Sequence, residues 1–243
     1  MKKVTQIALA LASFTLLFMI DACKKDDNNP IGSKDQSQLS AARIGNPSLV
    51  FPPQAHMSGK TYEGWIAEWW KWNLQFDCSH FPLSDVNGSR QNQNQSGPVF
   101  FLSGRRGHTL NVTVPHDVTL FLPIITYYAD AQVLAPGVEQ SLLSNVTSTV
   151  DLMDQLSLTI DGVSISDLGD YKFVTPLFTF TGNADLANCY DSDITGNPEP
   201  MVAGGYFFML KALSPGQHTI HRIGGASALF PFVFDITYNI TAL

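Results

Sequence analysis

The sequence predicts a mainly β protein, an antiparallel β-sandwich with one tryptophan-rich helix near its N-terminus and one further helix. Three observations predict this fold class. From about residue 98 onward, short apolar runs alternate with turn residues. One earlier segment, 61–76, instead repeats its aromatic residues at helical spacing. Charged residues make up only 14% of the chain, which suits a domain rich in buried strands.

The segment Thr61–Phe76 is the clearest predicted helix, and Thr61 is a suitable N-cap. Its large apolar residues share one face: Tyr62, Trp65, Ile66, Trp69, Trp72 and Phe76. Such a stripe either packs into the core or offers flat rings on which sugars stack. Trp70 lies off the main face, so we expect its ring to be partly exposed and consider it a candidate ligand-binding residue.

The other expected elements are mostly short strands. They cover residues 99–102, 109–114, 118–125, 158–160, 163–165, 206–210, 217–223 and 232–240, with one or two more strands between 171 and 180. A second helix is expected over 139–156, where Val146, Val150, Met153 and Leu156 fall on one face.

The N-terminus predicts export. Two lysines precede an uncharged, mostly apolar run, 4–20, so residues 1–22 are expected to be a signal peptide. Ile20, Asp21, Ala22 and Cys23 resemble the lipobox of bacterial lipoproteins, although Asp21 departs from the usual pattern. The resemblance implies that Cys23 carries the lipid that anchors the protein to a membrane. The alternative is ordinary cleavage after Ala22, which would leave Cys23 a free thiol.

The mature chain is expected to begin with a lipidated, disordered tether, 23–45, followed by a single β-sandwich domain with helical insertions, 46–243. Residues 24–29 resemble the short signal that places some lipoproteins on the outer face of the outer membrane. We therefore expect an outer-membrane lipoprotein that is exposed on the cell surface. A plain solvated tether on a lipoprotein that faces the periplasm is the alternative.

The charge of the chain argues against nucleic acid as a partner. The formal net charge is −7, and removing residues 1–22 takes away two basic and one acidic side chain, which leaves −8. Phosphate recognition needs clustered lysine and arginine instead.

Beyond Cys23 the chain has two cysteines, Cys78 and Cys189. In an oxidising compartment two cysteines predict one disulfide. Two separate buried thiols are the alternative, because sequence alone does not bring their α-carbons within reach.

Near the C-terminus, Leu213, Pro215, Gly216 and His218 resemble the corner at which immunoglobulin-like sandwiches pass from one sheet to the other. His218 stands where tyrosine is usual, so the resemblance implies that an imidazole makes the corner hydrogen bond. The fold is therefore expected to be immunoglobulin-like or jelly-roll-like.

The chain as a whole is similar to an uncharacterised family of exported bacterial proteins. The similarity lies in the tryptophan segment 62–72, in 97–102, in 121–125 and in the run from Gly204 to His221. It implies no functional residue.

Two constellations are candidates for chemistry. Glu63 and Glu68 could serve a glycosidase or a binding site, but their spacing places them about 140° apart around the helix, so they are not expected to face one cleft. Asp191, Asp193, Thr195 and Asn197 offer alternating oxygen ligands before and after a glycine, which favours either structural Ca²⁺ or a solvated turn. No other cofactor is expected, and no catalytic residue stands out.

These features favour a non-catalytic, lipid-anchored envelope protein whose sandwich presents a binding surface, with carbohydrate or another envelope protein as its partner. A polysaccharide hydrolase is the first alternative, on the tryptophans and carboxylates. A structural or assembly protein of the outer membrane is the second.

Overall fold

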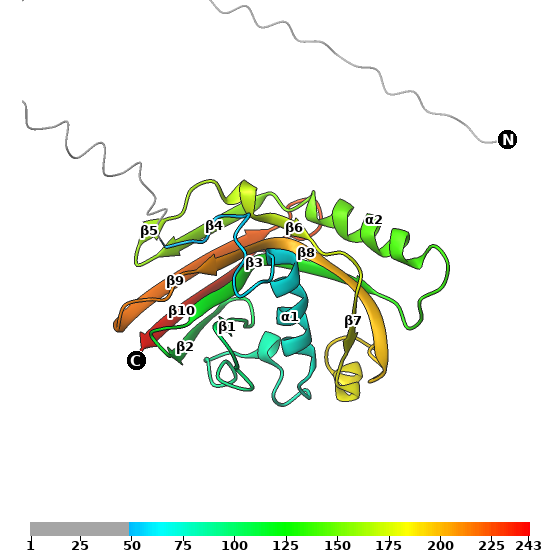
Figure 1. The fold of residues 1–243 in the computed structure, drawn as a ribbon, viewed down its shortest axis with the longest axis horizontal. Helices are drawn as coiled ribbons and strands as arrows, with labels where there is room; N and C mark the ends of the chain where they lie inside the picture. Colours follow the sequence, from blue (N-terminus) through cyan, green and yellow to red (C-terminus); the bar gives the residue numbers. More distant parts are fainter. Residues whose placement is uncertain (1–48) are drawn as a thin grey trace, which may run out of the picture.

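The computed structural model describes residues 49–243, so the predicted signal peptide, the tether and Cys23 lie outside the described residues. The described chain is mainly β with two α-helices, as the sequence predicts (Figure 1). The helices are α1 (Tyr62–Leu74) and α2 (Val138–Val150). The strands are β1 (Val99–Phe101), β2 (His108–Val114), β3 (Thr119–Asp130), β4 (Gln155–Ile160), β5 (Val163–Ser164), β6 (Lys172–Val174), β7 (Phe178–Thr181), β8 (Pro198–Leu210), β9 (Gly216–Gly225) and β10 (Phe234–Ala242).

The strands form two five-stranded sheets. The first has the order β1-β3-β8-β6, with β7 also paired to β8, and the second has the order β2-β10-β9-β4-β5. Two pairs are parallel, β1 with β3 and β2 with β10, so the sheets are mixed and the expectation of a purely antiparallel sandwich is wrong in this detail. The cause of the first parallel pair is topological. After β1 the chain contributes β2 to the second sheet and then returns as β3, in the direction of β1.

The sheets approach most closely where β3 meets β9. A side chain at Gly224 of β9 would place its Cβ 2.5 Å from the carbonyl oxygen of Ile124 in β3, so only glycine fits there. Next to it, β3 has a register irregularity between Pro123 and Ile125, opposite β8. This contact between the sheets bounds the pocket described below.

Helix α1 begins where the sequence predicts, with the side chain of Thr61 accepting a hydrogen bond from the amide of Gly64 at 3.3 Å. Its tryptophan stripe is core. Trp65, Trp69 and Trp72 are buried, and each indole donates to a backbone carbonyl, of Met57, Leu102 and Gln93 respectively. Figure 1 shows α1 in front of the first sheet, near β7 and β8.

Several elements differ in length from the sequence prediction. Helix α2 ends at Val150 rather than Leu156, because Gln155 and Leu156 pair with β9 as the start of β4. Strands β3 and β8 are longer than expected. Almost every residue of β8 is buried, so it lacks the apolar and polar alternation by which sequence reasoning recognises a strand.

The C-terminal corner makes the hydrogen bond that its resemblance implies. His218 Nε2 lies 2.8 Å from the carbonyl oxygen of Ser214, and Nδ1 lies 2.8 Å from an oxygen of Asp161. Both of these partners are acceptors, an arrangement that favours the protonated imidazole. The hydrogen bond with Asp161 accordingly raises the pKa of His218. His221 bonds a different carboxylate, Asp235, so the two histidines do not form a metal pair.

Within residues 49–243, no helix is both long and apolar enough to cross a bilayer.

The two cysteines form the predicted disulfide. Cys78, just after α1, is bonded to Cys189, 111 residues later, with the α-carbons 6.0 Å apart. The same junction has a hydrogen bond from the Cys78 amide to the side chain of Asp185. The bridge therefore fixes the segment that carries Tyr190 and Asp191 to the end of the tryptophan helix.

Replacing both cysteines, Cys78→Ala with Cys189→Ala, should lower the free energy of unfolding by about 2–5 kcal/mol, because the bridge restricts the unfolded chain over a long loop. Urea unfolding of the variant, and of the parent protein with and without a reductant, measures this. If free-thiol titration shows that the reductant opened the bridge, equal stability of the parent in both conditions would contradict its stabilising effect.

Candidate functional site

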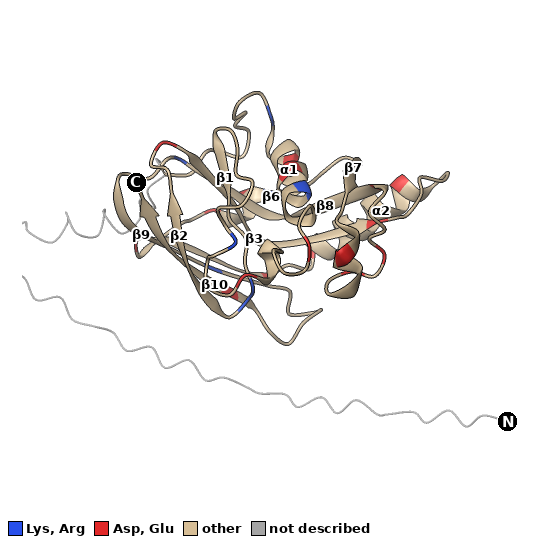
Figure 2. Ribbon diagram, turned by 90° about the horizontal axis from the view of Figure 1, so that it is seen from below, with Lys and Arg blue, Asp and Glu red and all other residues tan. Residues whose placement is uncertain are grey.

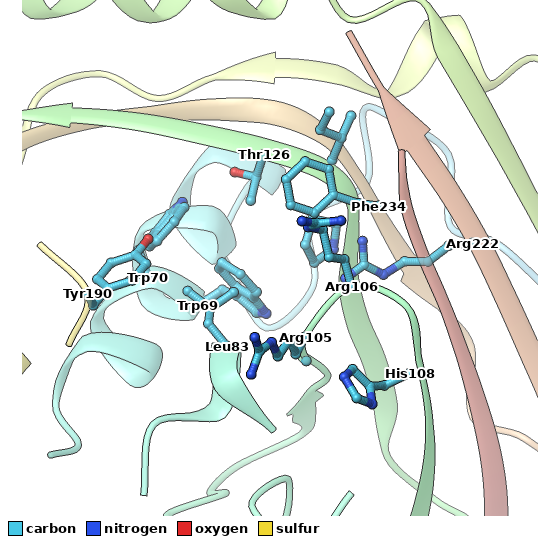
Figure 3. Close-up of a pocket in the computed structure, with 13 residues that line it drawn as sticks. Trp69, Trp70, Leu83, Arg105, Arg106, His108, Thr126, Tyr190, Arg222 and Phe234 are labelled. Atoms are coloured by element: carbon cyan, nitrogen blue, oxygen red, sulfur yellow. The ribbon is translucent and has the colours of Figure 1, made fainter. Parts of the chain in front are cut away.

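The arginine pocket is a cavity of about 570 Å³ between helix α1, strand β3 and the second sheet (Figure 3). We define it by seven of its lining residues: Trp69, Trp70, Arg105, Arg106, His108, Tyr190 and Arg222. The tryptophans come from α1, and Arg222 comes from β9. Its size is that of a small-molecule site, which typically spans roughly 300–1,000 Å³.

Arg222 occupies a core position. It lies between Ile220 and Gly224 on the inward face of β9, and only 4% of it is exposed. Its guanidinium donates to the carbonyl oxygen of Ile124 at 2.6 Å and to the hydroxyl of Tyr238 at 3.2 Å. Both acceptors are neutral, so within residues 49–243 the guanidinium is buried without a carboxylate partner.

Arg105 and Arg106 lie on the exposed loop that enters β2. The amide of Arg105 donates to the carbonyl of Asp85 at 2.8 Å, which fixes the loop. Gly104 begins this turn with a φ of 142° against Leu110, a conformation and a closeness that favour glycine. The guanidinium of Arg106 lies 4.0 Å from the ring centre of Phe232, a cation–π contact that orients it.

Among the described residues, the arginines of the pocket make no ion pair. Each ion pair among residues 49–243 involves a lysine or a histidine, and none involves an arginine. Figure 2 shows basic segments near β3 and β10, whereas several acidic segments lie toward β7, β8 and α2. An acidic chain thus holds three arginines at one cavity.

Trp70 is buried rather than partly exposed, which corrects the sequence expectation. Only 2% of it is accessible, because its ring packs edge-on against Trp69 and 4.6 Å from the ring of Tyr128. Its Nε1 is a buried donor without a hydrogen-bond partner in the described chain. The exposed ring at this place is Tyr190, with an accessible fraction of 39%.

A second depression of about 460 Å³, the acidic depression, adjoins the arginine pocket. The two share Trp70, Thr126 and Tyr190. Its own residues include Tyr128, Asp130 and Asp191, and the Tyr128 hydroxyl donates to Asp191. We call the two together the cleft.

Burial, followed by the charges of Asp191, Glu199 and Asp193, raises the pKa of Asp130 to about 6. The desolvated Tyr128 and Tyr190 also have raised pKa values, so both hydroxyls stay protonated at neutral pH. One end of the cleft is therefore cationic, and the other end holds a carboxyl group that titrates near neutrality.

The predicted calcium loop makes local hydrogen bonds. Asp191 accepts from the amide of Asp193, and the amide and hydroxyl of Thr195 donate to Glu199. Asn197 bonds Thr195. In the described part of the chain, no three histidine, cysteine or acidic side chains gather as metal ligands. Glu199 is fully buried, and its second carboxylate oxygen lacks a partner.

Glu63 and Glu68 do not join Trp70. They border a separate depression beside Val174 and Phe178. Sequence spacing predicts that they would not face one cleft, yet both line this hollow, because it extends along the helix between them. Glu68 bonds Lys60 and Lys71 at 3.4 Å and 3.6 Å, which neutralises it.

Comparisons of the chain with protein-family models, with curated proteins and with solved structures found no match.

The side chains of the cleft are suited to binding a polar small molecule. It offers arginine donors at one end, an exposed ring at the junction, and carboxylate acceptors at the other end. Sequence reasoning found Trp70 and Asp191 but missed Arg222, Tyr190 and the arginine loop. Arg222 could have been found from the period of β9, because it occupies the same face of the strand as Ile220 and Gly224, which point to the core.

Asp130→Asn should flatten the pH dependence of stability. The folded state binds the Asp130 proton more tightly than the unfolded chain, so stability should fall as pH rises from about 4 to about 6. At pH 7 the variant should be more stable by about 1 kcal/mol, allowing for partial exposure. Urea titrations from pH 4 to 7 measure this, with Asp117→Asn as the exposed control. A parallel pH profile for Asp130→Asn and its parent would contradict the raised pKa.

Proposed function

We propose that this chain is a lipid-anchored protein of the bacterial cell envelope that binds a carbohydrate in the cleft. The observation that carries the proposal is the junction of its two halves. There an exposed tyrosine ring, Tyr190, lines the same depression as the carboxyl groups of Asp130 and Asp191. Sugars need both features, a flat apolar face for their C–H groups and fixed polar partners for their hydroxyls.

The rigidity of the junction supports this proposal. Tyr190 follows the disulfide directly and packs against Phe81, with ring centres 4.6 Å apart. Trp70 is held by Trp69 and Tyr128. Preorganised rings lose little conformational entropy on binding, so their contact contributes more to affinity.

The export features support the location. The signal peptide 1–22 and the lipobox-like Cys23 belong to a lipid-anchored protein, and an acyl anchor of two chains holds stably. The disulfide agrees with an oxidising compartment.

Binding of a glycan should raise the melting temperature of the purified full-length protein in detergent. A ligand at 100 times its Kd adds about 2.7 kcal/mol of stability, enough for a shift of a few degrees. Tyr190→Leu keeps an apolar side chain but removes the ring, so it should weaken binding on the order of 10-fold. Leu152→Ala, an exposed change at the end of α2, is the control.

A panel of neutral and acidic oligosaccharides, followed by calorimetry, makes this measurement. If one glycan binds and Tyr190→Leu weakens it selectively, the assignment stands. If no glycan in the panel shifts the melting temperature, the proposal fails, and the structural or assembly role becomes the better one.

A polysaccharide hydrolase is the second candidate, and the pair Asp130 and Asp191 favours it. Both line the acidic depression, and a carboxyl group with a pKa near 6 suits a general acid. The test is release of reducing ends from a bound glycan. If Asp130→Asn abolishes turnover but still binds the glycan, the protein is a hydrolase. If the parent binds the glycan without turnover, the protein is a non-catalytic binding protein.

Cys23→Ala should abolish lipid attachment. Labelling of growing cells with a palmitate analogue should mark the parent and not the variant. The variant should also move from the membrane fraction to the soluble exported fraction. Ser33→Ala, a change in the predicted tether, serves as the control. Labelled Cys23→Ala protein would contradict the lipobox interpretation.

A further inference from the structure

We infer that the arginine pocket holds an anionic group, so that the ligand is an acidic sugar with a carboxylate or a sulfate. The sugar half of this inference rests on the proposed function, and the anion half rests on the pocket itself. Its starting point is the buried guanidinium of Arg222.

Burying a charge without a counter-charge costs free energy. Arg222 is 96% buried, since only 4% of it is exposed, and no carboxylate lies within 4.0 Å of it in the described chain. Its two acceptors, a backbone carbonyl and a tyrosine hydroxyl, only partly offset that cost. An anion in the pocket would supply the missing charge.

The nearby carboxylates are engaged elsewhere. Asp85, buried under the pocket loop, accepts hydrogen bonds from the amides of Asn87, Gly88 and Arg90 and from the side chain of Gln91. Asp235, next to the strand partner of Arg222, bonds His221 instead. Neither carboxylate forms an ion pair with a pocket arginine in the described chain.

The other polar groups of the pocket add donors. Arg105 and Arg106 project from their loop toward the same cavity as Arg222 (Figure 3). A guanidinium group can donate two parallel hydrogen bonds to the oxygens of a carboxylate or sulfate, so it matches these anions in geometry as well as in charge. His108 also lines the cavity.

The two ends of the cleft also orient such a ligand. The anionic group lies against the arginines, because Asp130 and Asp191 at the other end repel it. The uncharged part of the sugar then extends past Tyr190, and its hydroxyls donate to the carboxylates. This separation of positive and negative charge along the cleft favours a ligand with its anionic group at one end.

The test is calorimetry on the full-length protein in detergent with an aldobiouronate, a disaccharide with one carboxylate at its end, and with its methyl ester, which lacks the charge and carries one added methyl group. A sulfated disaccharide and inorganic sulfate serve as further probes, the first for the other acidic class and the second for the anion without a sugar. We expect the acid to bind at least 10-fold more tightly than the ester, or the sulfated sugar to bind where the ester does not. The affinity should also fall with added salt.

Arg222→Met, which keeps the length of the side chain, should weaken binding of the acidic sugar on the order of 10- to 100-fold. It also removes the hydrogen bonds to Ile124 and Tyr238, so the melting temperature of the free variant is measured beside its affinity. Lys71→Met, which removes one positive charge outside the pocket, should leave the affinity unchanged. If Arg222→Met does not fold, the exposed double variant Arg105→Gln with Arg106→Gln replaces it and should weaken binding similarly.

The outcomes separate the two proposals. Equal binding of acid and ester would overturn the anion site while leaving carbohydrate binding in place. Inorganic sulfate that binds through Arg222, with no sugar bound, would keep the anion site and overturn the carbohydrate function. Acid binding that neither Arg222→Met nor the double variant weakens would overturn the assignment to this pocket.

Discussion

The structure depends on the burial of the tryptophan stripe of α1 between the first sheet and the loops that follow the helix. Trp69 is fully buried, with its ring 5.9 Å from that of Phe207 in β8 and its indole N–H on the carbonyl of Leu102, just beyond β1. Burying large rings supplies much of the stabilising free energy of a domain this size. Because Trp69 is fixed from two sides, the neighbouring Trp70 has one available position, at the junction of the cleft.

The cleft contains polar groups that core packing has buried at a cost in free energy. Three of its residues would be unremarkable in other settings: a tryptophan on a core helix, an arginine on a strand and a tyrosine after a disulfide. Here Trp70 is buried without a partner for its N–H, and Arg222 is buried without a counter-charge. Such local costs persist at functional sites, where a ligand relieves them. This is why the cleft, rather than the hollow beside Glu63 and Glu68, is the candidate site. There the lysines already neutralise Glu68.

The separation of charge also gives the cleft a direction. The arginines come from β9 and from the loop before β2, both associated with the second sheet, whereas Asp130 ends β3 of the first sheet and Asp191 follows the disulfide. Each end therefore belongs to a different part of the fold, and the shared residues Trp70, Thr126 and Tyr190 join them. The chain has a net charge of −7, so the clustered arginines give this one cavity a positive electrostatic potential on an acidic protein.

The sequence by itself determined the local features: the mainly β class, the N-cap Thr61, the buried stripe of α1, most strands and the corner at His218. Periodicity, capping and turn chemistry act over a few residues, so they are visible in the chain. Only the tertiary structure decided which strands pair in parallel, that Trp70 is covered by Tyr128, and that Arg222, Arg105 and Tyr190 meet. These contacts join segments that lie far apart in sequence. The period of a strand shows which face a residue occupies but not what lies opposite that face.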